Sequence, residues 1–159
     1  MIIVEDLLKF FKKKNINFFS GVPDSILKNT SYFFEKLNKY KHITAVNEGA
    51  AVSISIGYYL STNKIPCVYL QNSGLGNAIN PLISIAHKRV YSIPLLLLIG
   101  WRGSPRFKDE PQHMVKGKIT KNILKLLNIK NCVLRNKNDF KKLSILINFA
   151  KKQKHLQLA

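Results

Sequence analysis

What this sequence lacks excludes several classes of protein. Its longest apolar run, Pro94 to Trp101, is far shorter than the roughly 20 residues that a membrane-spanning helix needs. The first residues carry neither the basic segment nor the small-residue cleavage site of a secretory signal. Only two cysteines occur, Cys67 and Cys132, without the CxxC or Cys/His spacing of a metal site. We therefore expect a cytoplasmic protein with free thiols, no membrane association and no metal ligands of its own.

Acidic residues and arginines are also scarce. The chain has 8 Asp and Glu against 26 Lys and Arg, a formal net charge of +18. Such an excess is common in proteins that bind nucleic acids. However, only 4 of the 26 are arginines, and the lysines are scattered without the aromatic interleaving that reads bases. A nucleic-acid-binding module is therefore a minor alternative, and an acidic partner or an anionic substrate explains the charge more simply.

Strand patterns alternate with helical patterns along the whole chain. Strands are expected at residues 17–20, 42–46, 65–70, 95–101 and 131–134, and the run at 95–101 is apolar enough to be buried. Helices are expected at residues 4–14, 26–37, 49–60, 119–127 and 140–152. Another is expected after the glycine segment, with Pro81 early in it and Leu82 to His87 continuing it. This alternation predicts an α/β fold, with a mostly parallel sheet and helices on both faces. At 159 residues, the length fits a single domain over residues 1–159.

Polar or glycine-rich segments follow four of the expected strands. They are Gly21-Val22-Pro23-Asp24-Ser25, Asn47-Glu48-Gly49, Gln71-Asn72-Ser73-Gly74-Leu75-Gly76-Asn77, and the long irregular segment from Arg102 to His113. The carboxyl ends of parallel strands meet at one edge of a sheet, where α/β proteins bind ligands. We therefore expect the four segments to converge on one site.

Glu48 is the most informative residue, because it stands between an apolar strand and an apolar helix. Burial there would raise the pKa of its carboxyl group, which could then share a proton with a basic ring nitrogen. The simpler interpretation is that Glu48 caps its own helix, and the same alternative holds for Asp24 or Ser25. The glycine segment at 71–77 fits neither a Walker loop nor a dinucleotide fingerprint, so alone it is a weak signal.

Together these segments resemble a known family. The first three segments are joined by two motifs within and beside the fourth, Gly100-Trp101-Arg102-Gly103 and Lys108-Asp109-Glu110-Pro111-Gln112-His113. In this order, the five motifs resemble the N-terminal pyrimidine-binding (PYR) domain of thiamine diphosphate-dependent decarboxylases of the phosphonopyruvate decarboxylase type. The alpha subunit of sulfopyruvate decarboxylase is a close relative in which this domain is a separate chain. The Trp-Arg-Gly and Asp-Glu-Pro-Gln-His segments favour the phosphonopyruvate branch.

The resemblance implies roles for residues at the cofactor. Glu48 would hydrogen-bond N1′ of the aminopyrimidine ring and stabilise its imino tautomer. Asp24 and His113 would transfer protons or position substrate at the reacting centre. The residues that match the turn facing the cofactor are Asn72, Gly74, Leu75 and Asn77.

On the substrate side, the implied residues are Ser25, Arg102 and Lys108. Arg102 is our first hypothesis for the cation that meets the phosphonate, because a guanidinium group can donate two parallel hydrogen bonds. Lys108 is the second candidate, and ordinary solvation of the loop is its alternative.

The resemblance also implies a partner. The family holds the cofactor's diphosphate through Mg²⁺ at a Gly-Asp-Gly segment on a second domain, and no Asp in this sequence is followed by Gly. Thiamine diphosphate and Mg²⁺ would then be held mainly by a beta subunit or a C-terminal diphosphate-binding domain, in an α2β2 or larger assembly. The lysine excess could help to dock an acidic partner, and assembly would then be sensitive to salt.

The expected reaction is the decarboxylation of phosphonopyruvate to phosphonoacetaldehyde and CO2. Two alternatives stay open, the decarboxylation of sulfopyruvate and a non-catalytic partner subunit of the same fold. Both substrates are three-carbon keto acids with a terminal oxyanion, so a basic loop could serve either.

Overall fold

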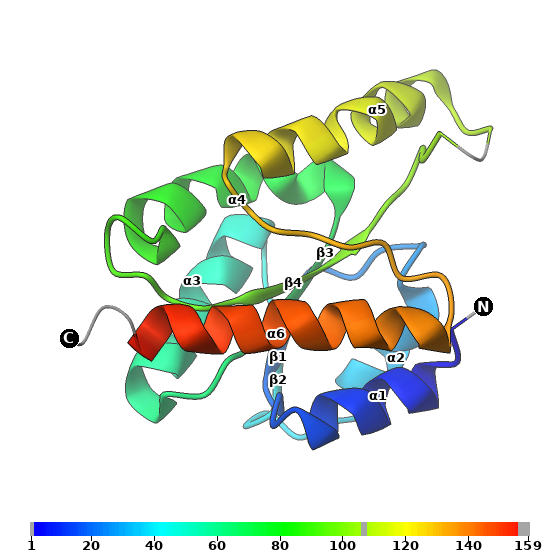
Figure 1. Cartoon of the computed structure of the whole chain (residues 1–159). Helices are drawn as coiled ribbons and strands as arrows, with labels where there is room; N and C mark the ends of the chain where they lie inside the picture. Colours follow the sequence, from blue (N-terminus) through cyan, green and yellow to red (C-terminus); the bar gives the residue numbers. More distant parts are fainter. Residues whose placement is uncertain (1, 106–107, 156–159) are drawn as a thin grey trace.

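A single parallel sheet forms the centre of the molecule (Figure 1). The computed structural model describes residues 2–105 and 108–155. The strands are β1 (Phe19–Gly21), β2 (His42–Thr44), β3 (Cys67–Gln71) and β4 (Leu96–Gly100). All pairings are parallel, in the order β2-β1-β3-β4. The predicted parallel α/β fold is therefore confirmed.

Two hydrophobic clusters, one on each face of the sheet, hold the helices. The helices of one face are α3 (Glu48–Thr62), α4 (Leu75–Pro81) and α5 (Pro111–Leu126). Those of the other face are α1 (Val4–Lys13), α2 (Lys28–Glu35) and α6 (Phe140–His155). In β3, Val68 and Leu70 belong to the first cluster and Cys67 and Tyr69 to the second, because successive strand residues point to opposite faces. No helix in the described part of the chain is long and apolar enough to cross a membrane.

The expected glycine loop at residues 71–77 is helical from Asn72 onward, and Gln71 is the last residue of β3. A 3-10 turn, η1 (Asn72–Gly74), leads directly into α4, and a π-helical turn, η2 (Leu82–Ala86), continues from it. Pro81 therefore lies at the end of α4 and not early in a later helix, as the sequence predicted. The π-helical turn starts where proline, which has no N–H group, interrupts the helical hydrogen bonds.

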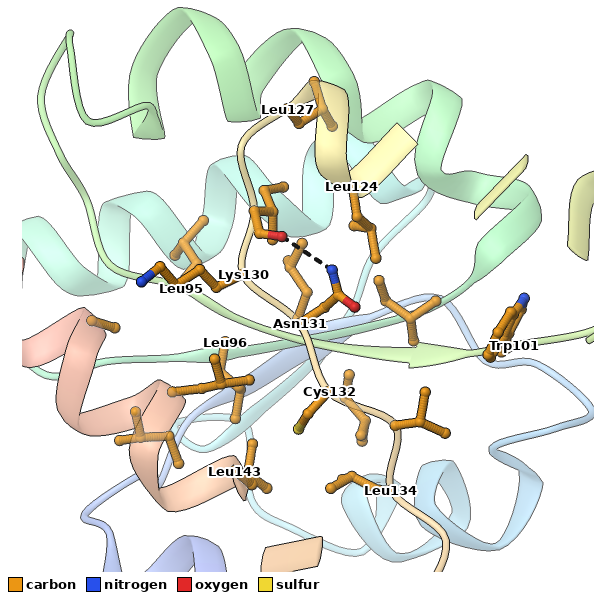
Figure 2. Close-up of a pocket in the computed structure, with 18 of the residues that line it drawn as sticks. Leu95, Leu96, Trp101, Leu124, Leu127, Lys130, Asn131, Cys132, Leu134 and Leu143 are labelled. Atoms are coloured by element: carbon orange, nitrogen blue, oxygen red, sulfur yellow. Dashed lines mark hydrogen bonds between the residues drawn. The ribbon is translucent and has the colours of Figure 1, made fainter. Parts of the chain in front are cut away.

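The prediction of a fifth strand at residues 131–134 is wrong. Residues 131–135 form a strap that crosses β4 without regular secondary structure (Figure 2). Ile129 contacts the cluster on the α3 face, whereas Cys132 and Leu134 contact the cluster on the α6 face, so the strap connects the two faces. Because the segment crosses β4 instead of running parallel to it (Figure 2), its backbone does not form the ladder of hydrogen bonds that a fifth strand needs.

The strap leaves β4 at the edge of the sheet. The β4 residues from Leu96 to Ile99 are only half-buried, whereas the sequence predicted a buried strand. A cavity of about 1120 Å³ with mainly apolar walls lies against β4 and the strap, and its lining includes Leu95, Leu124, Cys132 and Leu143 (Figure 2). The thiols of Cys67 and Cys132 are both free, and burial raises the pKa of Cys67.

A buried polar pair spans the middle of the sheet across β1. The Tyr69 hydroxyl group lies 2.8 Å from Nε2 of His42, and Phe34 packs beside both rings. The Tyr69 ring lies over Gly21, where any Cβ would overlap with it. Burial raises the pKa of Tyr69 to about 12. Burial also lowers the pKa of His42, and the charge of Glu35 opposes this only in part.

We expect His42 to make the stability of the fold depend on pH. Because its pKa is lower in the folded chain than the ordinary value of 6.5, the unfolded chain takes up this proton first as the pH falls. The free energy of unfolding should therefore decrease as the pH drops below about 6.5. Urea unfolding at pH 7.5 and 5.5 measures this, and His42→Gln should reduce the difference between the two values. His87→Gln, outside the cluster, is the control, and an unchanged pH dependence in His42→Gln would contradict the prediction.

Candidate functional site

The four polar segments converge at one edge of the sheet, as predicted. They follow Gly21, Thr44, Gln71 and Gly100, the last residues of four parallel strands. Hydrogen bonds and close contacts join them into two groups. Glu48, Gly74 and Asn77 form the first, and residues around Arg102 form the second.

Glu48 is the first residue of α3, but it does not cap this helix. Asn47 is the N-cap, and its Oδ1 accepts a hydrogen bond from the N–H group of Ala50 at 2.8 Å. Glu48 is therefore not the cap, although it lies in the first turn, where an acid favours the free N–H groups. Its half-buried carboxylate accepts a hydrogen bond from Nδ2 of Asn77 at Oε2, at 2.8 Å. No described residue donates a hydrogen bond to Oε1, which lies against Gly74, so the described part of the chain does not use this acceptor.

Two glycines bring the Glu48 carboxylate against the turn that follows β3. A Cβ on Gly74 would overlap with the carboxylate, and a Cβ on Gly49 would lie 2.8 Å from the carbonyl oxygen of Asn77. The structure thus places Glu48, Gly74 and Asn77 together, as the sequence suggested. Leu75 differs, because its side chain is fully buried in the cluster between α3 and α4.

Arg102 links three of the four segments. Its Nη1 donates to Oγ of Ser25 and its Nε to Oδ2 of Asp109, both at 3.3 Å. Its backbone N–H group donates to Oδ1 of Asn72 at 3.1 Å, and its carbonyl oxygen accepts from Nδ2 of Asn72 at 3.0 Å. Hydrogen bonds therefore hold both the guanidinium group and the backbone of Arg102.

Asn72 uses its amide group within the protein. Besides its two bonds to Arg102, Nδ2 donates to Oγ1 of Thr120 on α5 at 2.9 Å, and the side chain is buried. Asn72 therefore positions the Arg102 loop and α5, and its amide is not turned to a ligand. Thr120 was missed from the sequence, because a threonine inside a helix carries no signal of this contact.

Asp109 is a second residue that the sequence analysis did not single out. Its Oδ2 accepts from the Arg102 side chain and from the N–H group of Gly103, and its Oδ1 accepts from the N–H group of Glu110. The hydrogen bond from the N–H group of Glu110 is the largest effect and lowers the pKa of Asp109. Burial opposes it, and the hydrogen bond and charge of Arg102 add smaller lowering effects. Asp109 is therefore a stable anionic partner for Arg102. Its place in the quoted loop was the available signal.

Asp24 caps a turn and also leaves one oxygen unused. Its Oδ1 accepts from the N–H groups of Ile26 and Leu27 in the turn before α2. The N-cap of α2 is Leu27, without a side-chain cap, so the interpretation that Asp24 or Ser25 caps this helix is wrong. Its Oδ2 is buried without a hydrogen-bond partner in the described part of the chain. This oxygen lies against Gly100, where a Cβ would be 2.8 Å away. A buried carboxylate oxygen without a partner marks a place where a ligand donor fits.

His113 lies in the first turn of α5, which begins earlier than predicted and shortens the irregular segment after Arg102. Its side chain is half-buried. Gly103, with a φ of +66°, packs its backbone against the carbonyl group of His113. Lys108 is exposed, and residues 106–107 of the same segment lie outside the described residues. Among the residues placed in the structure, no three His, Cys, Asp or Glu side chains could together hold a metal ion.

These features define a parallel α/β domain with a candidate ligand site at the carboxyl ends of its strands. The family model for the N-terminal TPP binding domain of thiamine pyrophosphate enzymes matches residues 1–125, and the chain belongs to this family. Thiamine pyrophosphate is the same compound as thiamine diphosphate. The resemblance that the motifs suggested is thus confirmed at the level of the family.

Individual relatives agree with this assignment. The chain is 32% identical over 145 residues to phosphonopyruvate decarboxylase of Streptomyces viridochromogenes, covering 87% of this chain and 34% of that protein. It is 31% identical over 125 residues to sulfopyruvate decarboxylase subunit alpha of Methanococcus maripaludis, covering 79% and 72%. The chain therefore spans about one third of the length of the phosphonopyruvate decarboxylases that it matches.

A solved structure shows the same fold. Benzoylformate decarboxylase from Polynucleobacter necessarius superposes with a TM-score of 0.54 at 22% sequence identity, covering 67% of this chain and 19% of that one. At this identity, the likeness concerns the fold alone.

We expect Asn72→Ala to destabilise the chain by about 2–4 kcal/mol, because it removes three hydrogen bonds and leaves buried partners unsatisfied. Urea unfolding measures the change. Asn148→Ala, at an exposed position on α6, is the control and should change the free energy of unfolding by less than about 0.5 kcal/mol. Equal midpoints for the two variants would show that the Asn72 bonds do not hold the loop.

Proposed function

We propose that this chain is the pyrimidine-binding part of a thiamine diphosphate-dependent decarboxylase that converts phosphonopyruvate to phosphonoacetaldehyde and CO2. The observation that carries the proposal is Glu48, whose Oε2 is held by Asn77 and whose Oε1 has no hydrogen-bond donor among the described residues. The relatives named phosphonopyruvate decarboxylase support this substrate. Sulfopyruvate is the second candidate, because the alpha subunits of sulfopyruvate decarboxylase are similar to this chain.

The residues around Glu48 fit the aminopyrimidine ring of the cofactor. Oε1 of Glu48 would share a proton with ring nitrogen N1′, and the hydrogen bond from Asn77 would fix the orientation of the carboxyl group. Gly74 keeps the space beside the carboxylate free of side-chain atoms. When bound, thiamine diphosphate supplies the electron sink that allows a 2-keto acid to lose CO2.

The second group would bind the substrate. Arg102, oriented by Asp109 and Ser25, is the proposed cation for the phosphonate group, with Lys108 as the second candidate. Oδ2 of Asp24, buried without a described partner, and the half-buried His113 are proposed to hold or move protons at the substrate.

The rest of the active enzyme would come from elsewhere. We propose that a beta subunit or a further domain holds the diphosphate and most of the Mg²⁺ coordination, in an α2β2 or larger assembly. The name "subunit alpha" of the Methanococcus maripaludis relative supports a separate partner chain. The free thiols of Cys67 and Cys132 favour a reducing, cytoplasmic location. A non-catalytic subunit of this fold is the alternative.

The decisive test is CO2 release from phosphonopyruvate and, separately, from sulfopyruvate, with thiamine diphosphate and Mg²⁺. The chain alone is compared with the chain plus the proposed diphosphate-binding chain. We expect activity only in the pair, and Glu48→Gln should lower kcat at least about 100-fold while leaving the free energy of unfolding within about 1 kcal/mol. Glu5→Gln on the exposed side of α1 should leave both unchanged. A stable complex that releases no CO2 from either substrate would contradict the proposed function.

Arg102→Lys separates binding of the phosphonate from binding of the cofactor. Lysine keeps the charge but loses the two-pronged geometry, so kcat/KM for phosphonopyruvate should fall about 10- to 100-fold. The concentration of thiamine diphosphate that half-saturates the enzyme should stay the same. The controls are Arg89→Lys, which should have no effect, and Lys108→Gln. A larger decrease of kcat/KM in Lys108→Gln than in Arg102→Lys would show that Lys108, and not Arg102, is the main cation for the phosphonate.

A further inference from the structure

Helix α5 carries apolar side chains on the side turned away from the core. It lies at the periphery of the molecule, outside α4 (Figure 1). The residues that α5 buries are Gly117, Thr120 and Leu124. Its exposed apolar residues are Val115, Ile119 and Leu126, with exposed fractions of 61%, 43% and 85%. Spacings of four and seven residues place these three in one stripe, opposite to the buried side of the helix. We call this stripe the α5 ridge.

Helices α1 and α6 expose mainly lysines instead. On α1 the exposed residues are Glu5, Lys9, Lys12 and Lys13, and on α6 they include Lys141, Asn148 and Lys152. The only large apolar residue that the described part of α6 exposes is Ile145. Single exposed apolar residues are ordinary on protein surfaces, whereas an apolar stripe on the outer side of a helix indicates a binding surface.

Lysines border the α5 ridge on both sides. Lys118 and Lys125 follow one side of the stripe and Lys116 the other, and α5 contains no Asp or Glu. Two copies of the ridge facing each other would bring like charges together, which disfavours self-association. A surface with an apolar centre and acidic borders is complementary in both respects.

The α5 ridge is also connected to the candidate site. Thr120, on the buried side of the same helix, is bonded to Asn72, which in turn holds Arg102. The carbonyl oxygen of Gly117 accepts a hydrogen bond from Nε1 of Trp101 at 2.9 Å. A partner bound along the ridge would therefore contact the helix that is hydrogen-bonded to the loop carrying the proposed substrate residues.

We propose that the α5 ridge binds an amphipathic helix whose apolar stripe is bordered by Asp or Glu, on the chain that supplies the diphosphate-binding part of the enzyme. The identity of that chain rests on the proposed function. An anionic membrane is the other surface that matches a basic helix with an apolar stripe. The ridge has no aromatic residue, however, and membrane-surface helices commonly use Trp or Phe there.

The test is the affinity of the full chain for the diphosphate-binding chain in 50 and 300 mM NaCl, measured by biolayer interferometry. Ile119→Lys combined with Leu126→Lys should weaken association at least about tenfold at both salt concentrations, because it places charges in the apolar centre. Lys118→Glu combined with Lys125→Glu should weaken it strongly in 50 mM NaCl and less in 300 mM, because salt screens the charges. Lysine and glutamate both favour helix, and thermal melts check that each variant folds.

Matched controls lie on α6. Ile145→Lys repeats the apolar-to-lysine change, and Lys141→Glu combined with Lys152→Glu repeats the charge reversal, at exposed positions. Both should leave the affinity unchanged. Failure of the wild-type chain to associate, or wild-type affinity in the ridge variants, would overturn the proposal. A second result would also overturn it. In that result, the chain floats with vesicles of phosphatidylserine and phosphatidylcholine only when the ridge is intact, whereas its association with the partner chain does not depend on the ridge. Ridge-dependent association without CO2 release would support the docking surface and contradict the proposed function instead.

Discussion

The common direction of the four strands is the constraint on which the candidate site depends. Because every pairing in the sheet is parallel, four loops that lie far apart in the sequence begin at the same edge. No single loop contains a complete site. Glu48 follows β2 but lies against Gly74, which follows β3, and Arg102 follows β4 but bonds to Ser25, which follows β1. A reversal of any one strand would remove its loop from this edge.

Asn72 extends that order beyond the ends of the strands. Its amide both donates to and accepts from the backbone of Arg102, as a strand residue would do with its own backbone groups. The β3 and β4 pairing, which ends at Gln71 and Gly100, is thereby continued by a side chain. The Arg102 guanidinium group thus starts from a fixed backbone, and Asp109 and Ser25 then set its direction.

The sequence predicted the features that depend on local patterns. Alternating strands and helices were enough for the parallel fold, and loops after strands were enough for the shared edge. The capping role of Asn47 was not predicted, although Asn is a favoured N-cap residue and the sequence therefore contained a signal for it. Contacts between distant segments were not readable. The helical form of residues 72–77, the bond from Asn72 to Thr120 and the missing fifth strand all depend on packing across the sheet.

The strap at residues 131–135 has a consequence for the solubility of the folded chain. The outer side of an edge strand offers unpaired N–H and C=O groups on which a strand of another molecule can assemble. Because the strap crosses β4 instead of lying parallel to it (Figure 2), it interrupts that side partway along. An incoming strand would meet the strap before it could pair along the whole of β4. The described part of the chain thus has no fifth strand, but the strap protects the β4 edge of the sheet against aggregation.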